Sequence, residues 1–148
     1  MPFNTPPRTV LVPYDLDQPC PEALTAAAAL APAVAAMTVL YILEPTPAQA
    51  TLADDRNADA QSHLERPLAR LRVALDEAGL QEANARVAFG PPGPTIVESI
   101  QRDRPDLVVM PTHARRGLQR LVLGSVTEYV VRHARRPVLV LPLDTDST

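Results

Sequence analysis

Lysine is absent from this chain of 148 residues, and all 14 of its strongly basic side chains are arginines. A phosphate-binding loop of the GK[ST] type needs its lysine to reach the β- and γ-phosphates, so the sequence excludes that class of nucleotide hydrolase. The same absence excludes enzymes that form a Schiff base through lysine. It also argues against a response-regulator receiver domain, which requires a lysine after its last strands.

Cysteine and aromatic residues are also scarce. A single cysteine, Cys20, excludes an internal disulfide framework and a cysteine-based zinc site. Aromatic residues make up 3% of the chain, so alanine, valine and leucine must fill the core. Such a core favours helices packed on a buried sheet over an aromatic-rich β-sandwich.

Long hydrophobic segments are missing as well. The first ten residues contain no apolar run of signal-peptide length. The alanine-rich stretch 23–36 contains Pro32 and is shorter than the ~20 residues that a membrane-spanning helix needs. We therefore expect a cytoplasmic protein without a membrane segment.

Apolar runs typical of buried strands alternate with segments of helical pattern. The predicted strands are residues 8–14, 37–43, 82–89, 106–110 and 137–141. The predicted helices are residues 21–35, 54–78, 95–103 and 125–134, with Pro32 ending or kinking the first and Pro67 kinking or dividing the second. Continuous apolar strands that alternate with helices predict a parallel sheet covered on both faces. With right-handed crossovers, this is one α/β domain over residues 1–148 (core about 8–142), a three-layer, doubly wound, Rossmann-like fold.

Ligands of such sheets bind beyond the C-terminal ends of the strands, where the strand order reverses. Asp15, just after the first strand, could accept a hydrogen bond from a ribose hydroxyl or an adenine amino group. Alternatively, it forms an Asx turn or caps the following helix. Asp15 and Asp17 could also hold a magnesium ion with help from phosphate oxygens.

Gly124 and Ser125 directly precede the last helical pattern. Free backbone N–H groups and the helix dipole favour an anion at such a position, and glycine allows close approach of the backbone. Residues 125–128 (SVTE) also fit an S-x-x-E capping box, which explains Ser125 without any ligand. The box does not explain Gly124 or the long loop before it, and loops of that length are usually functional or disordered.

Arginines are concentrated in the C-terminal third, with eight of them in residues 102–136. They indicate either an anion site or solvated helix faces, which could also meet an acidic protein partner. Broad nucleic-acid binding is not expected, because the net charge is −3 and no aromatic residues interleave the arginines.

Five segments resemble the universal stress protein family. They are VPYD (12–15), FGPPGPTIVESI (89–100), DLVVMPTH (106–113), GSVTE (124–128) and RHARRPVLVLP (132–142). The resemblance extends over roughly residues 8–142. It implies a five-stranded parallel sheet in the order 3-2-1-4-5, and a homodimer formed through the last strand, residues 137–142.

Nucleotide-binding members of that family carry Gly-x-x-Gly, nine residues, and then Gly-Ser or Gly-Thr. In this chain Pro111 and Ala114 occupy the two early glycine positions, and Gly124 and Ser125 follow at the family's spacing. On the adenine and ribose side, the family's positions match at Pro13, Asp15, Ile42 and Met110. On the phosphate side, they match at Gly124, Ser125, Val126 and Thr127.

The two departures weaken the expected site. Pro111 has no N–H to donate, and Ala114 adds a methyl group where the backbone approaches the ligand closely. Each should lower affinity about tenfold or more. Arg115 and Arg116 could offset part of this loss through charge-assisted hydrogen bonds to phosphate.

The resemblance implies a stress-response regulatory protein that binds ATP or a related adenine nucleotide, with or without magnesium, and acts on an unidentified protein partner. We expect at most slow ATP hydrolysis, because no general base or lysine is evident. The alternative is a nucleotide-free dimeric interaction protein whose site has degenerated at Pro111 and Ala114. An enzyme of the wider nucleotide-hydrolase group is least supported, because DLDQPCPE (15–22) stands where its Gly-rich loop would be.

Overall fold

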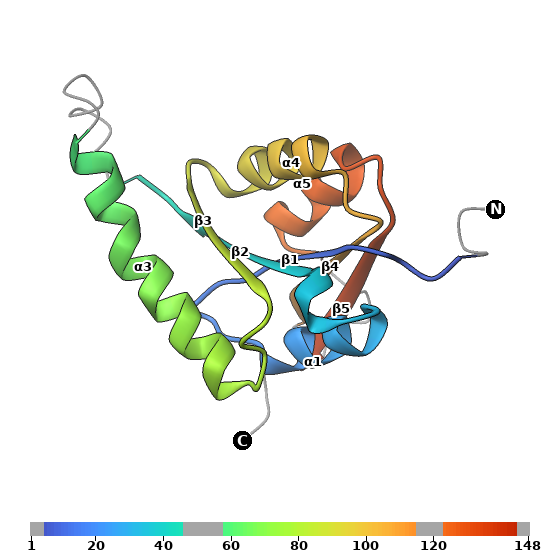
Figure 1. The fold of residues 1–148 in the computed structure, drawn as a ribbon. Helices are drawn as coiled ribbons and strands as arrows, with labels where there is room; N and C mark the ends of the chain where they lie inside the picture. Colours follow the sequence, from blue (N-terminus) through green and yellow to red (C-terminus); the bar gives the residue numbers. More distant parts are fainter. Residues whose placement is uncertain (1–4, 46–57, 115–122, 145–148) are drawn as a thin grey trace.

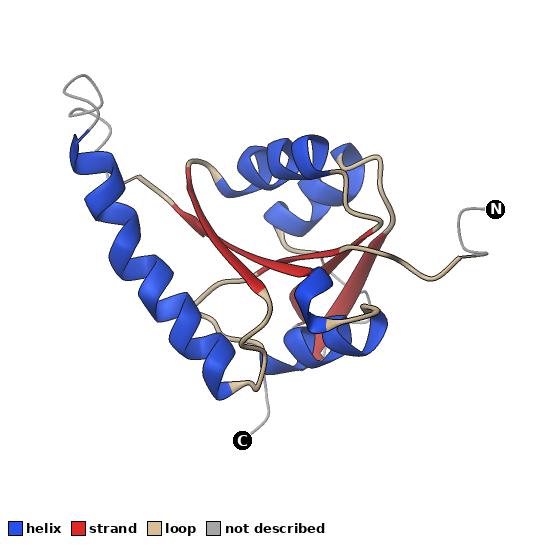
Figure 2. Ribbon diagram, viewed as in Figure 1, coloured by secondary structure: helices blue, strands red, loops and turns tan. Residues whose placement is uncertain are grey.

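The structure, a computed structural model, describes residues 5–45, 58–114 and 123–144. Within them lie the strands β1 (Val10–Pro13), β2 (Met37–Leu43), β3 (Asn84–Phe89), β4 (Leu107–Ala114) and β5 (Val138–Asp144). The helices are α1 (Pro21–Leu30), α3 (Ala58–Glu77), α4 (Pro92–Asp103) and α5 (Ser125–His133), with a short 3-10 helix over Val34–Ala36. All strand pairs are parallel, in the order β3-β2-β1-β4-β5, which confirms the predicted fold class and strand order (Figures 1 and 2).

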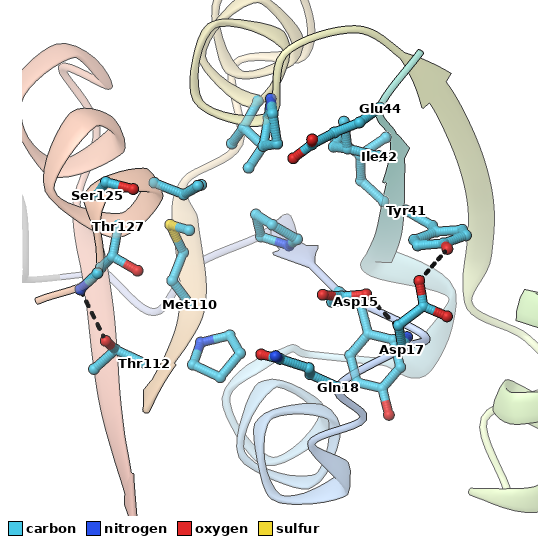
Figure 3. Close-up of a pocket in the computed structure, with 18 of the residues that line it drawn as sticks. Asp15, Asp17, Gln18, Tyr41, Ile42, Glu44, Met110, Thr112, Ser125 and Thr127 are labelled. Atoms are coloured by element: carbon cyan, nitrogen blue, oxygen red, sulfur yellow. Dashed lines mark hydrogen bonds between the residues drawn. The ribbon is translucent and has the colours of Figure 1, made fainter. Parts of the chain in front are cut away.

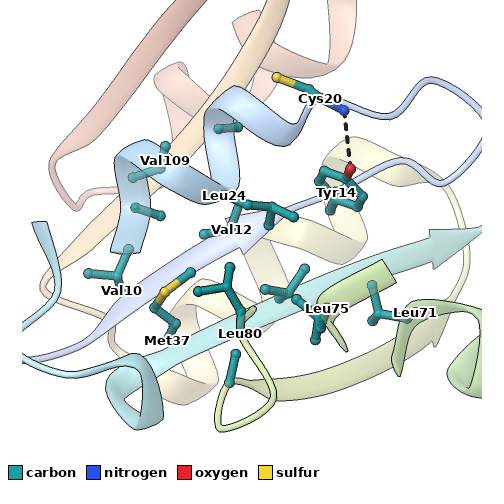
Figure 4. Packing of buried hydrophobic residues seen from close by; sticks show 14 of the residues in the cluster. Val10, Val12, Tyr14, Cys20, Leu24, Met37, Leu71, Leu75, Leu80 and Val109 are labelled. Atoms are coloured by element: carbon teal, nitrogen blue, oxygen red, sulfur yellow. Dashed lines mark hydrogen bonds between the residues drawn. The ribbon is translucent and has the colours of Figure 1, made fainter. Parts of the chain in front are cut away.

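The sheet separates two apolar cores, because successive side chains of a strand point to opposite faces. Val10 and Val12 of β1 face the core shared with α1 and α3, whereas Leu11 faces the core shared with α4 and α5. Figure 4 shows the first of these cores, in which Leu71 and Leu75 of α3 are fully buried. Burial on both faces accounts for the continuous apolar strands of the sequence.

Tyr14 closes the first core beyond the end of β1. Its side chain is buried, and its hydroxyl accepts a hydrogen bond from the Cys20 N–H at 3.2 Å (Figure 4). This bond joins the two ends of the turn between β1 and α1, and Asp15 lies within that turn.

Two prolines set helix boundaries that differ from the predicted ones. The first helix ends at Leu30 rather than near residue 35, because Pro32 forces Ala31 into an extended conformation (ψ 145°). Helix α4 begins at Pro92 rather than at residue 95. Proline, which lacks an N–H, is tolerated there because the N–H groups of the first turn have no acceptor within the helix. The predicted start of the second helix, residues 54–57, lies outside the described residues, and Pro67 lies inside one continuous helix.

Strand β3 begins at Asn84 rather than at residue 82, because a turn closed by the Ala83 N–H and the Leu80 carbonyl precedes it. Strands β4 and β5 both extend beyond their predicted ends, and they pair from Val108 with Val138 to Ala114 with Asp144. The missing N–H of Pro111 is tolerated there, because the pairing of β4 with β1 has already ended at Val108.

No helix in the described ranges is both long enough and apolar enough to cross a membrane.

Candidate functional site

A cleft of about 630 Å³ opens at the C-terminal ends of β1, β2 and β4, beside the first turn of α5. It lies where the strand order reverses, with β1 leading to α1 on one face and β4 leading to α5 on the other. The predicted site residues that line it are Pro13, Asp15, Ile42, Met110, Pro111, Gly124, Ser125, Val126 and Thr127 (Figure 3). Ala114 ends β4, but its side chain is outside the described part of the chain, as are Arg115 and Arg116.

The start of α5 differs from the capping-box alternative. Gly124 is the N-cap residue, with an extended backbone (φ −60°, ψ 156°) and no side-chain cap bond, and Ser125 is the first helical residue. From that position the Ser125 side chain does not cap the helix, and Glu128 instead pairs with Arg132 at 2.8 Å. The capping-box interpretation is therefore wrong, and the Ser125 side chain is exposed at the cleft.

The first amides of α5 are available to a ligand. The first internal bond of the helix joins the Glu128 N–H to the Gly124 carbonyl at 2.9 Å. The N–H groups of Ser125, Val126 and Thr127 precede that bond and have no acceptor among the described residues. Three such amides at the positive end of a helix dipole are an anion-binding arrangement.

Gly124 leaves space beside these amides. Its φ is ordinary for any residue, and a Cβ built on it would meet no atom within 4 Å. Its own N–H donates to the hydroxyl of the buried Thr112 at 3.4 Å. Sequence reasoning missed Thr112, because this contact depends on β4 extending past Met110.

Asp15 forms one of the structures considered for it and remains exposed in the cleft. Its Oδ1 accepts the Asp17 N–H at 2.9 Å, which is the predicted Asx turn. The capping alternative is wrong, since Cys20 is the N-cap residue of α1. Asp15 is nevertheless exposed in the cleft, and its carboxylate has further lone pairs with which to accept hydrogen bonds.

Asp17 is engaged on the β2 side of the cleft. Its Oδ2 accepts a long hydrogen bond of 3.4 Å from the Tyr41 hydroxyl, and Arg70 lies 3.7 Å from its Oδ1. Burial, with a smaller contribution from the Asp17 carboxylate, raises the pKa of Tyr41. Tyr41 therefore remains a neutral donor.

Binding of magnesium in the cleft would depend on a ligand that supplies further oxygen atoms. Asp15 and Asp17 both line the cleft, but the described part of the chain contains no group of three or more His, Cys, Asp or Glu side chains able to hold a metal. A magnesium ion here would therefore need phosphate oxygens to complete its coordination.

Glu44 also lines the cleft, and sequence reasoning did not single it out. It follows β2 as Asp15 follows β1, so the signal that could have found it was a carboxylate just past the end of a predicted strand. Apolar side chains of Ile42 and Met110, with Pro92 and Ile96 of α4, complete the lining. The cleft thus joins helix amides, carboxylates and an apolar wall.

Comparison with known sequences places these features in context. The sequence profile of the universal stress protein family matches residues 7–142. The universal stress protein MJ0531 of Methanocaldococcus jannaschii is 36% identical over 74 residues, which cover 50% of this chain and 43% of the relative. The universal stress protein Slr1101 of Synechocystis is 38% identical over 61 residues, 41% of this chain and 56% of the relative. The matched segments thus span about half the length of these curated relatives.

Solved structures share the fold. The hypothetical protein MJ0577 has a TM-score of 0.70 at 20% identity, with 96% of this chain and 100% of that chain covered. A universal stress protein in complex with cAMP has a TM-score of 0.60 at 24% identity (93% and 98% covered). An Arabidopsis thaliana family protein with AMP bound has a TM-score of 0.53 at 22% identity (96% and 95% covered). At such identities the likeness concerns the fold alone.

Proposed function

The chain belongs to the universal stress protein family, and from this premise we propose that it is a stress-response regulatory protein that binds ATP or a related adenine nucleotide in the cleft. The observation that carries the proposal is the first turn of α5, whose amides have no acceptor among the described residues and which lies across the cleft from Asp15 (Figure 3). The volume of about 630 Å³ is within the range of small-ligand pockets. The family members solved with cAMP and AMP support the choice of adenine nucleotides.

The proposed roles follow from the chemistry of each side of the cleft. The amides of Ser125, Val126 and Thr127 and the Ser125 hydroxyl donate to phosphate oxygens. Asp15 accepts a hydrogen bond from a ribose hydroxyl. Ile42 and Met110 offer apolar surface to the base.

Isothermal titration calorimetry with ATP, ADP and AMP tests the proposal. We expect saturable binding of at least one of them by the wild-type chain. An absence of binding heat at millimolar concentrations of all three would contradict it.

A second candidate, a nucleotide-free interaction protein, is favoured by one observation. Pro111 lies in β4 at the cleft, where it offers no N–H to a ligand. Under this alternative, Ser125 has no ligand, and the same titrations show no binding.

We also propose a homodimer formed through residues 137–142. Strand β5 is the edge of the sheet next to β4, and its apolar residues 138–141 are only half-buried. An uncovered apolar edge invites pairing with another strand. Light scattering on the purified protein should give twice the chain mass of 16.0 kDa, and a mass of one chain would contradict the dimer.

A further inference from the structure

The two sides of the cleft have opposite hydrogen-bonding characters. The α5 side presents amide donors, whereas the side formed by the ends of β1 and β2 presents the carboxylates of Asp15, Asp17 and Glu44 (Figure 3). An ionised carboxylate only accepts hydrogen bonds. A ligand that places its phosphate on α5 can therefore be held at its other end through donors that face these carboxylates.

Two of these three carboxylates already have partners. Asp15 accepts the Asp17 N–H at 2.9 Å, and Asp17 accepts the Tyr41 hydroxyl and faces Arg70. Glu44 is exposed, and within the described residues no hydrogen bond or ion pair engages it. Among the described residues, Glu44 is thus the one of these three carboxylates without a partner.

Glu44 is placed where it could contact the edge of a nucleotide base bound in the cleft. Its carboxylate points into the open middle of the cleft, beside Ile42 (Figure 3). Ile42 is half-buried, and Ile96 and Pro92 of α4 add apolar surface to the same lining. A base lying on this surface would meet the carboxylate with its edge.

We infer that the Glu44 carboxylate accepts a hydrogen bond from the 6-amino group of the bound adenine, and so selects adenine over purines that lack this group. The inference rests on the proposed function, since it takes the ligand to be an adenine nucleotide. It adds a polar contact to the base in a site whose other proposed polar contacts hold ribose and phosphate.

The test compares AMP with purine riboside 5′-monophosphate, which lacks only the 6-amino group, by isothermal titration calorimetry. The wild type should bind AMP about tenfold more tightly, the size expected for one hydrogen bond to a charged acceptor. Glu44→Ala should abolish this preference. Glu44→Gln should keep part of it, because its amide oxygen still accepts. Removing the charge of Glu44 changes the affinity for both anions alike, so the ratio of the two affinities isolates the hydrogen bond.

Glu98→Ala is the matched control, because Glu98 is an exposed glutamate of α4 outside the cleft lining. This variant should retain the wild-type preference. Equal binding of the two nucleotides by the wild type, or an unchanged preference in Glu44→Ala, would overturn the inference and leave the proposed function standing. Failure of AMP and of every other adenine nucleotide to bind the wild type would overturn both.

Discussion

The hydroxyl of Thr112 in β4 accepts the amide N–H of Gly124 at 3.4 Å, which joins the end of the strand to the start of α5. Thr112 is buried, whereas Gly124 is exposed, so the bond is partly buried. The bond fixes the N-cap amide beside the three following amides, which precede the first internal bond of α5 and have no acceptor among the described residues. Thr112 is therefore a positioning residue in the proposed anion site.

Replacing Thr112 by valine should separate this role from packing. Thr112→Val keeps the shape of the side chain but removes the acceptor, so we expect a loss of about 1 kcal/mol in the free energy of unfolding. ATP affinity should fall severalfold, because the first turn of α5 is less well fixed. Thr112→Ser, which retains the hydroxyl, should preserve the affinity. Urea unfolding and calorimetry measure the two effects, and an unchanged affinity in Thr112→Val would remove the positioning role.

Ser125→Ala distinguishes a ligand contact from a helix cap. Since Ser125 is the first helical residue and not the N-cap, its replacement should change the free energy of unfolding by less than about 0.5 kcal/mol. ATP affinity should fall about tenfold through the loss of one phosphate contact. The reverse pattern, a stability loss of about 1 kcal/mol with unchanged affinity, is what a capping serine would give.

Restoring glycine at the two early motif positions should strengthen the site. In Pro111→Gly/Ala114→Gly, residue 111 regains an N–H and residue 114 loses its methyl group, so ATP affinity should rise at least tenfold. Calorimetry on the wild type, both single variants and the double variant would apportion the gain. If neither position changes the affinity, these substitutions are not what limits binding.

Acid should weaken the contact between β3 and α4. Burial alone would raise the pKa of Asp103, but hydrogen bonds and charge from Arg86 and Arg102 outweigh it and hold that pKa below its usual value. A carboxyl whose pKa is lowered in the folded state stabilises the fold above its unfolded pKa of about 3.9, and this stabilisation disappears as the pH falls through the folded pKa.

The free energy of unfolding should therefore fall from pH 5 toward pH 2 less steeply in Asp103→Asn than in the wild type. Asp76→Asn is the control, because Asp76 is exposed on α3 and forms no ion pair within the described ranges. Urea unfolding as a function of pH gives the comparison. Parallel curves for Asp103→Asn and the wild type would contradict the role of the ion pair.

Much of the fold could be predicted from the sequence, since continuous apolar strands and prolines are local signals. The length of β4 could not, because its extension past Pro111 depends on pairing with β5, far along the chain. The register of α5 was also ambiguous, because S-x-x-E fits Ser125 either as a cap or as the first helical residue. Only the backbone of Gly124 decides between them.

The candidate site shows the same division. The family resemblance predicts which residues approach the cleft from β1, β2, β4 and α5. The structure brings them together, apart from Ala114, whose side chain is not described. Thr112 and Glu44 were not predicted as site residues. The role of Thr112 depends on its contact with Gly124, and that of Glu44 on the cleft which it lines. The contributions of Arg115 and Arg116 remain predictions, since both lie outside the described residues.

We propose that the amides of the first turn of α5, which have no acceptor among the described residues, bind the phosphates of an adenine nucleotide. The most direct test of this proposal is a titration of the ¹⁵N-labelled protein with ATP, followed through the amide resonances of Ser125, Val126 and Thr127. We expect these three resonances to shift together and to saturate with one dissociation constant, while the amide resonance of Glu98 in α4 stays in place. Saturable binding of ATP that leaves all three resonances unmoved would contradict it.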